Sequence, residues 1–318
     1  MIEVFATPHG ISVNSCMPIF PEFAPVNLAS STIINNHTSR FEPYSDFNFI
    51  SLWSWDTAGE RKYSILNDNL VILFTDYTTE EPFLSLLGDK KVDESVEILL
   101  SYSEKNNLPN ELRLVPEVVV KNLSNEFVCY EDENNNDYIF STEKIRDYAG
   151  NKYKNKRQLK NKFENTYSNA VLGRESASSA TAQVKVFELL QKWANNKQDE
   201  QKDFDLKHEQ SAILRALKAA DNDLKVLLTT LHLDDKIIAF SIDEVVSEGY
   251  AISHFFKTDH EHIGCTEFFN SELAALLHNE KIIHWNWEQD LGLQALKDVK
   301  NRYRPVSYLK KFVLRRTE

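Results

Sequence analysis

The chain has 318 residues, 42% of them hydrophobic and 26% charged, with a net charge of −12 at pH 7. This composition is that of a globular protein of about two domains, and 8 Gly and 9 Pro exclude collagen or a long disordered linker. Cys16, Cys129 and Cys265 are too few and too widely spaced for a disulfide framework, which favours a reducing compartment. Without a run of about 18 apolar residues or a signal peptide, we expect a cytoplasmic protein with no transmembrane segment.

Helices and strands alternate in the first half. A cap at Ser45-Asp46 begins a short helix through Trp53. Strands at 61–66 and 70–77 form a hairpin around Asn67-Asp68-Asn69. The other expected elements are helices at 89–107 and 117–123 and strands at 112–115, 127–130 and 138–140.

The second half opens with helices and continues with strands. We expect helices at 153–171, 182–195 and 206–220, strands at 225–233, 236–246 and 250–257, a helix at 267–278, a strand at 282–287, a helix at 291–303 and a strand at 306–314. The links between the three consecutive strands are long enough only for antiparallel hairpins. This order is typical of a GNAT-type acyltransferase with an additional helix in front.

Basic residues are concentrated in two segments of this acidic chain. The segments 144–162 and 297–316 each hold eight basic residues and one acidic residue. Such a distribution can hold an anion in one place and repel it elsewhere, whereas the net charge argues against stable DNA binding. Charge alone favours the alternative, two solvated surfaces with extended lysine side chains.

Two long motifs carry a family resemblance. They are DYIFSTEKIRDYAGNKYKNKRQLKNKF at 137–163 and NWEQDLGLQALKDVKNRYRPVSYLKKF at 286–312. With SDFNFISLWSW at 45–55, they resemble the phosphatidylglycerol lysyltransferase C-terminal domain family. The resemblance implies an α/β (α+β) tandem GNAT-like fold, with two mixed sheets flanked by helices. We expect N-terminal and C-terminal GNAT-like domains at 1–140 and 141–318.

The same resemblance implies an activity. Such proteins transfer an acyl group, typically an aminoacyl group from charged tRNA, to an amine or hydroxyl acceptor. No further cofactor is expected. The membrane-embedded part of the namesake enzymes is not found in this sequence, so a small molecule, a lipid and a peptide all stay open as acceptors.

Three cations are candidates for binding phosphate. Lys156 and Arg157 match the family motif near the start of the helix expected at 153–171, and a helix N-terminus with nearby cations attracts anions. Arg304 is held at a corner by Pro305, which cannot continue the preceding helix. The alternatives are a solvated helix face for Lys156 and Arg157 and a charge that complements the helix dipole for Arg304.

Three polar residues follow the strand expected at 282–287. In a GNAT fold this strand diverges from the strand at 250–257, and the acyl donor enters the opening. We expect Asn286 to bind substrate there, and Glu288 and Asp290 to be catalytic carboxylates that accept a proton from an attacking amine or bind an α-ammonium group. A helix N-cap is an equally good interpretation of Asp290.

The loop at 259–265 bears on the donor. Its single glycine and its acidic residues Asp259 and Glu261 are unfavourable for a coenzyme A pyrophosphate. His260, His262 and Cys265 are metal-ligand types, but a polar loop is the commoner explanation, and we expect no metal. An acyl-CoA-dependent N-acyltransferase and a non-catalytic anion-binding module are therefore the alternatives to aminoacyl transfer.

Overall fold

The computed structural model describes residues 17–76, 79, 81–197, 206–220 and 224–317. Its first half contains β1 (Ala24–Pro25), η1 (Leu28–Ser30), α1 (Ser31–Thr38), η2 (Ser45–Phe47), α2 (Phe49–Ser54), β2 (Lys62–Leu66), β3 (Asn69–Thr75), β4 (Pro82–Leu87), α3 (Val92–Lys105), β5 (Leu112–Pro116), α4 (Glu117–Val120), β6 (Phe127–Glu131), η3 (Glu133–Asn135) and β7 (Asp137–Ser141). The linker that follows contains α5 (Thr142–Asp147), η4 (Asn151–Tyr153) and α6 (Lys154–Thr166). The second half contains β8 (Val171–Glu175), α7 (Ala180–Lys197), α8 (Leu206–Ala219), β9 (Val226–Leu233), β10 (Lys236–Ser247), β11 (Tyr250–Thr258), α9 (Cys265–Asn279), β12 (His284–Asn286), α10 (Gln294–Arg302), β13 (Ser307–Leu309) and β14 (Lys311–Arg316).

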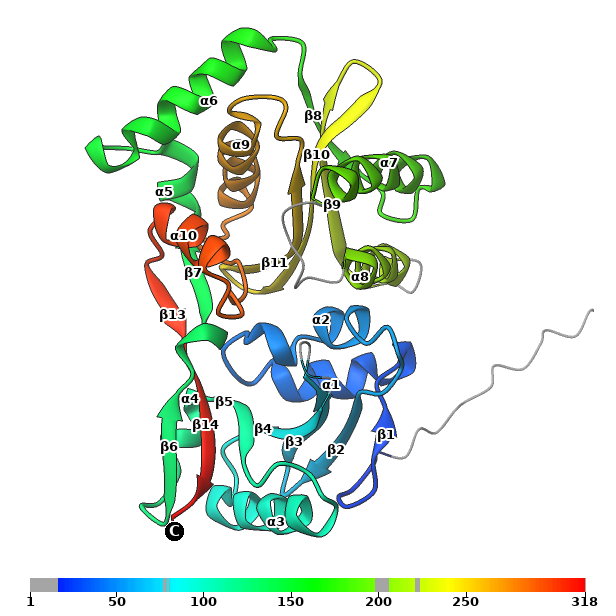
Figure 1. The fold of residues 1–318 in the computed structure, drawn as a ribbon, viewed down its shortest axis with the longest axis vertical. Coiled ribbons are helices and arrows are strands. Elements are labelled where there is room, and N and C mark those ends of the chain that lie inside the picture. Colours follow the sequence, from blue (N-terminus) through cyan, green and yellow to red (C-terminus); the bar gives the residue numbers. More distant parts are fainter. Residues whose placement is uncertain (1–16, 77–78, 80, 198–205, 221–223, 318) are drawn as a thin grey trace, which may run out of the picture.

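The strands form two seven-stranded sheets, one in the lower and one in the upper half of Figure 1. Their orders are β1-β2-β3-β4-β5-β14-β6 and β13-β7-β12-β11-β10-β9-β8. In each sheet four antiparallel strands are followed by one parallel pair, β4 with β5 and β11 with β12. Helices flank both sheets, which confirms the predicted α/β class with two mixed sheets.

The element order of the first half is repeated in the second. With the short 3-10 helices left aside, β1 to β7 and β8 to β14 both run as one strand, two helices, three strands, a helix, a strand, a helix and two strands. The linker helices α5 and α6 connect the copies. The tandem fold is therefore visible in the topology itself.

The last strand of each copy lies in the other copy's sheet. β7 pairs with β12 and β13, and β14 pairs with β5 and β6. Neither sheet is thus built from one continuous half of the chain, although the boundary at residue 140 itself stays a prediction. Lys311, at the start of β14, is fully buried, and its Nζ lies 2.7 Å from Oδ1 of Asp137 at the start of β7.

Four local predictions were wrong or incomplete. The single strand expected at 306–314 is two strands in different sheets, because the chain crosses between sheets at Lys310 without a turn residue to mark the break. The helix expected at 153–171 ends at Thr166, and the edge strand β8 follows. β1, α1, β4 and α5 had no sequence prediction. The cap of α2 is Asn48, not Ser45, since its side chain accepts the N–H groups of Ile50 and Ser51.

The parallel pair of the second sheet diverges as predicted. β11 and β12 are in register at three positions, ending with Ile252 opposite Asn286. β11 continues to Thr258, whereas the chain leaves β12 after Asn286. The splayed strands therefore leave an edge of β11 without a neighbouring strand in the described structure.

Candidate active site

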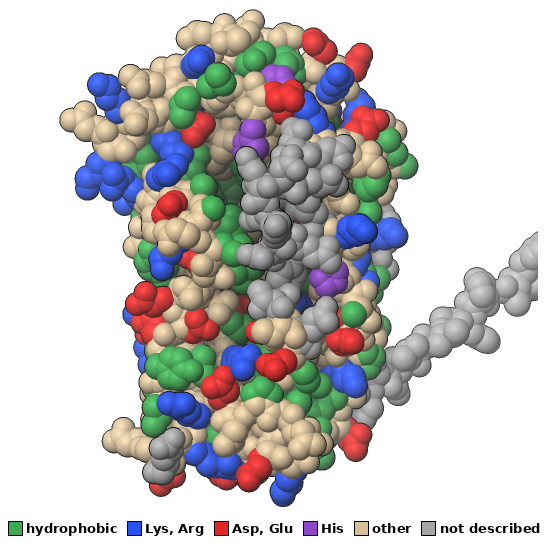
Figure 2. All heavy atoms as spheres, in the orientation of Figure 1, with side chains coloured by type: hydrophobic (Ala, Val, Ile, Leu, Met, Phe, Trp, Pro, Cys, Tyr) green, Lys and Arg blue, Asp and Glu red, His purple; other side chains and the backbone are tan. Residues whose placement is uncertain are grey.

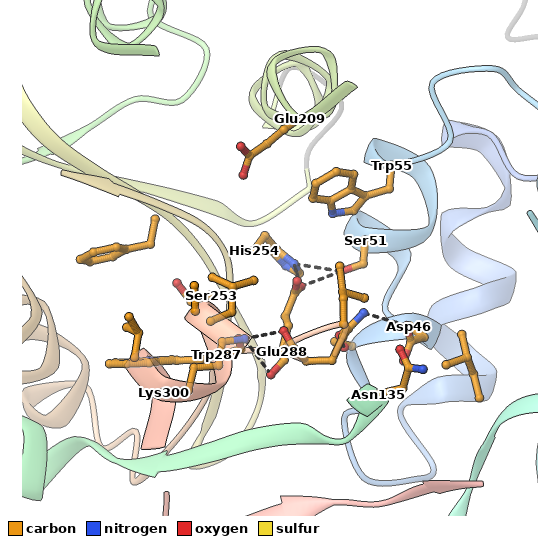
Figure 3. A pocket seen from close by; sticks show the side chains of 18 of the residues that line it. Asp46, Ser51, Trp55, Asn135, Glu209, Ser253, His254, Trp287, Glu288 and Lys300 are labelled. Atoms are coloured by element: carbon orange, nitrogen blue, oxygen red, sulfur yellow. Dashed lines mark hydrogen bonds and ion pairs between the residues drawn. The ribbon is translucent and has the colours of Figure 1, made fainter. Parts of the chain in front are cut away.

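A cavity of about 760 Å³ lies where the two halves face each other. The first half contributes residues of α2, β3, β4 and β5, and the second half contributes β11, the segment after β12, and α10. Figure 3 shows Ser51 of α2 and Trp55, directly after this helix, opposite Ser253 and His254 of β11, with Glu288 between them. The opening between the diverging strands thus belongs to a site formed by both halves.

A row of charged side chains reaches this cavity. His254 is fully buried, with Nδ1 3.2 Å from Oε1 of Glu288 and Nε2 3.3 Å from Oε2 of Glu244. Burial alone would lower the pKa of His254, but hydrogen bonds and charge from the two glutamates outweigh it and raise the pKa to about 9. The imidazole is therefore a cation at neutral pH, held between two carboxylates.

The other half of the molecule completes this row. The hydroxyl of Ser51 donates to Oε1 of Glu288 at 3.0 Å, and the side-chain amide of Asn48 donates to Oε2 of Glu244 at 2.8 Å. Both residues belong to the start of α2, whose N-terminal cap is Asn48 itself. The cap that begins this helix therefore also contacts the second half.

The backbone at Glu288 is strained and held in place. Its φ of 57° lies in the left-handed region, which is unfavourable for a residue with a side chain. The Oδ1 atom of Asn286 accepts the Glu288 N–H at 2.7 Å. Nζ of Lys300 donates to the carbonyl oxygens of Trp287, Glu288 and Gln289 at 2.7, 3.2 and 2.6 Å. Strain that neighbours fix in this way is typical of functional positions.

Lys300 is itself unusual. It lines the cavity, and burial lowers its pKa to about 8 although Glu288, Asp137 and Asp290 act in the opposite direction. Its three carbonyl partners leave its ammonium group fully occupied by the segment that carries Glu288. We therefore assign Lys300 to supporting this segment.

Glu288 is the one member of the six predicted site residues that lines this cavity. Asn286 is fully buried, and its amide donates to Asp137 at 3.0 Å and to the carbonyl of Pro43 at 3.1 Å. Asp290 is also fully buried and accepts the hydroxyl of Tyr138 at 2.5 Å. Asn286 thus supports Glu288, and the catalytic role of Asp290 stays a prediction that its position does not favour.

Asp290 does not cap α10 either. That helix begins at Gln294 after Leu293, while Oδ1 of Asp290 accepts the N–H of Gly292 at 2.8 Å. The carboxylate therefore stabilises the turn before the helix.

The predicted phosphate ligands at the start of α6 have internal partners. Nζ of Lys156 lies 3.0 Å from Glu267 and 3.7 Å from the centroid of the Tyr303 ring. Arg157 donates to the carbonyl oxygens of Tyr148 and Gly150. Their contact with phosphate stays a prediction, and in this structure both side chains hold α6 against its neighbours.

Exposed cations do gather beside these two residues. The hydroxyl of Tyr153 donates to the carbonyl of Tyr303 at 3.0 Å, so the segments 152–154 and 302–304 lie side by side. We call their exposed cations, which form no ion pair with any described residue, the basic surface: Lys152, Lys154, Arg302 and Arg304. Figure 2 shows Lys and Arg side chains gathered at the upper left, where Figure 1 places α5 and α6. Tyr303, which lies between Arg302 and Arg304 in the chain, is buried and lines the cavity, so these two cations flank a residue of the cavity wall.

The loop before α9 is closed by ion pairs. Nζ of Lys192 lies 2.8 Å from Asp259 and 2.6 Å from Glu261. Gly264 has a φ of +88°, and a Cβ atom there would lie 2.1 Å from the carbonyl oxygen of Leu159 in α6. Thus α6 passes directly over the N-terminus of α9. Among the described residues no group of three or more His, Cys, Asp or Glu side chains could hold a metal ion.

Sequence reasoning missed four residues of the site: Asn48, Ser51, Glu244 and His254. His254 lies in a strand of mostly apolar residues, and a single buried histidine is a weak signal. Asn48 and Ser51 lie in the first half, far away in sequence, and nothing local links them to Glu288. The signal that could have found them is the SDFNFISLWSW motif itself, whose polar residues interrupt an otherwise apolar helix.

Comparison with solved structures shows which known folds this chain resembles. A conserved protein of unknown function from Bacteroides thetaiotaomicron is 24% identical, with 93% of this chain and 99% of that chain covered and a TM-score of 0.80. The C-terminal domain of a putative lysylphosphatidylglycerol synthetase from Agrobacterium fabrum is 10% identical, with coverages of 91% and 92% and a TM-score of 0.63. L-PGS from Bacillus licheniformis is 14% identical, with coverages of 81% and 84% and a TM-score of 0.54. With the repeated topology, these likenesses define a tandem GNAT-like fold.

The family follows from the sequence itself. The family model for the C-terminal part of phosphatidylglycerol lysyltransferase matches residues 38–315, and the chain belongs to this family. A search of curated protein sequences found no significant match. Family and fold together support a GNAT-like acyltransferase. Within the described ranges, no helix has the length and apolar character needed to cross a bilayer.

Proposed function

We propose that this protein transfers an aminoacyl group from charged tRNA to an amine or hydroxyl acceptor in the cavity. The observation that carries the proposal is the strained Glu288, whose carboxylate is fixed in the opening between two diverging strands. The same left-handed backbone occurs at Leu114 in the first half, so the support comes from the carboxylate that the second half places at this position. The family and the related solved structures support the same chemistry.

The proposed reaction uses the strand edge and the carboxylate. The β11 edge beyond Ile252 offers backbone N–H groups that polarise the donor carbonyl. The acceptor nitrogen attacks this carbon, an N–C bond forms, and the ester C–O bond to the tRNA ribose breaks. Glu288 accepts the proton that the nitrogen loses, and the ribose oxygen leaves as a hydroxyl after protonation. With a hydroxyl acceptor, a new O–C bond forms in place of the N–C bond, and the other bond changes and proton transfers are the same.

The geometry around α9 favours tRNA over coenzyme A as the donor. A pyrophosphate binds well at a helix N-terminus with free N–H groups. Here α6 covers that end of α9 at Gly264, and the preceding loop carries Asp259 and Glu261. The basic surface beside the cavity offers a place for RNA phosphates instead. A location in the cytoplasm, where charged tRNA is made, stays a prediction.

Two measurements test the proposal. Binding of charged tRNA, followed by fluorescence anisotropy at several salt concentrations, should weaken steeply as salt rises, and incubation with an amine acceptor should release free tRNA. Binding that is absent or independent of salt contradicts a tRNA donor. A thermal shift with acetyl-CoA or a longer acyl-CoA would favour the acyl-CoA-dependent N-acyltransferase. Salt-dependent binding without transfer to any acceptor would favour a non-catalytic anion-binding module.

A further inference from the structure

The charged row from Glu244 to Glu288 offers an inference beyond the proposed reaction. Both ring nitrogens of His254 are engaged, and the side chain is fully buried. The ring therefore has no free nitrogen with which to bind a ligand in the cavity. His254 can therefore affect the site only through the groups that it contacts.

The contacts converge on one oxygen of Glu288. Oε1 faces Nδ1 of His254 at 3.2 Å and accepts the hydroxyl of Ser51 at 3.0 Å. Oε2 has no partner among the residues that the structure describes, and the Glu288 side chain is 17% exposed. One oxygen is thus anchored, which leaves the other for a ligand.

We propose that His254 is a positioning residue, a buried cation that Glu244 holds and that fixes the reactive carboxylate of Glu288, with α2 of the first half completing the arrangement. This proposal rests on the proposed function, because the carboxylate of Glu288 is reactive only in the proposed transfer. It makes the first half a structural part of the active site, since Asn48 and Ser51 bind the two carboxylates on either side of the imidazole.

The charges around the imidazole support a cation. Glu244 and Glu288 contact it directly, and Asp243 on β10 lies near enough for the two charges to interact. Burial raises the pKa of Asp243 to about 6, and this carboxylate accepts the indole N–H of Trp285 at 3.3 Å. Lys300 is the opposing charge, near Glu288. A neutral imidazole would leave the two glutamates facing each other across the ring without compensation.

A nuclear magnetic resonance titration tests the geometry without any substrate. The full chain is prepared with ¹³C- and ¹⁵N-labelled histidine, and the His254 signals are assigned with His254→Gln. We expect the ring to stay protonated at pH 8, and Glu288→Gln and Glu244→Gln each to lower its proton affinity about tenfold or more. A ring that titrates near 6.5, or that neither substitution affects, overturns the proposal.

A kinetic comparison tests the positioning role. His254→Gln and Ser51→Ala should each lower kcat about tenfold or more, with little change in KM for the acceptor. His232→Gln is the matched control, because His232 forms a similar pair with Glu175, at 3.1 Å, on strands β9 and β8, and does not line the cavity. If kcat in both test variants changes no more than in this control, the proposal is overturned. If His254→Gln does not fold, Glu244→Gln takes its place.

The two proposals fail in different ways. If the wild-type protein transfers no aminoacyl group while the titration shows the coupled cation, the proposed function fails and the charged row stands. If transfer occurs with normal kcat in the His254 and Ser51 variants, the proposed function stands and the positioning role fails.

Discussion

Each sheet contains one parallel pair of strands, and the residues beyond that pair differ between the two sheets. In the first sheet the parallel strands are in register at Leu84 and Leu112, and two residues further along each strand come Leu86 and Leu114. In the second sheet the last registered pair is Ile252 and Asn286, and two residues further come His254 and Glu288. Apolar side chains of β4, β5 and α4 pack together in the first half.

Both halves have a left-handed backbone at this position, although the side chains differ. Leu114 and Glu288 have φ values of 54° and 57°, and both line the cavity. A repeated fold thus supplies the same strained position twice, once with a leucine and once with a carboxylate. Under the proposed function, the second half would carry the reacting group, and the first half contributes a wall of the cavity and α2.

The largest expected effect is on Glu288. Glu288→Gln keeps the size of the side chain and removes its basicity, so we expect the rate of aminoacyl transfer to fall about 10²- to 10⁴-fold. Leu114→Ala, the corresponding change in the first half, should cost less than about tenfold because it removes only apolar contact. Single-turnover transfer from charged tRNA measures both, with Glu280→Gln on the outer end of α9 as the control. Equal losses at Leu114 and Glu288 would contradict this division between the halves.

A buried ion pair joins the two exchanged strands, β7 and β14. Lys311→Met removes the buried cation that Asp137 and Asp46 share and leaves carboxylates without compensation. We expect a loss of about 3–5 kcal/mol in the free energy of unfolding, measured by urea denaturation. Lys310→Met is the neighbouring control, because Lys310 pairs with Glu131 at the surface and should contribute little. Similar midpoints for the two variants would show that the exchanged strands do not need this pair.

The stability of the second half should depend on pH through His254. Its pKa is raised from 6.5 to about 9 in the folded state, so its contribution is complete below pH 6.5 and is lost as the pH rises through about 9. Between pH 6.5 and 8 the free energy of unfolding should fall by about 2 kcal/mol. Above pH 8 the lowered pKa of Lys300 acts in the opposite direction. The comparison of wild type with His254→Gln isolates the effect, and parallel curves would exclude a charged imidazole.

The smallest effect is expected at the basic surface. Arg304→Gln removes one exposed cation beside the cavity, which should weaken tRNA binding a few-fold and lower the slope of log K against log salt by about one. Lys105→Gln, at the end of α3 in the first half, is the matched control and should leave both unchanged. The binding of tRNA to both variants is measured from low to moderate salt. An equal change in both variants would indicate unspecific attraction.

Several features of the fold follow from local patterns. The hairpin of β2 and β3, the three antiparallel strands β9 to β11 and the amphipathic helices lie within a few residues of their expected positions. These elements depend on short-range periodicity and turn residues, which the sequence contains directly. The break between β13 and β14 does not follow from a local pattern, because both strands share one apolar pattern and only their partner strands differ.

The family resemblance of the sequence motifs predicted the tandem arrangement, the divergence of β11 from β12 and the position of Glu288 near their opening. The three-dimensional packing was needed to show that Lys156 and Arg157 hold α6, that Asp290 is buried, and that Asn48, Ser51, Glu244 and His254 complete the site. The reason is physical: a charged side chain has the same appearance in a sequence whether it faces solvent or a buried partner. Which of the two it meets is decided by packing between segments that are far apart along the chain.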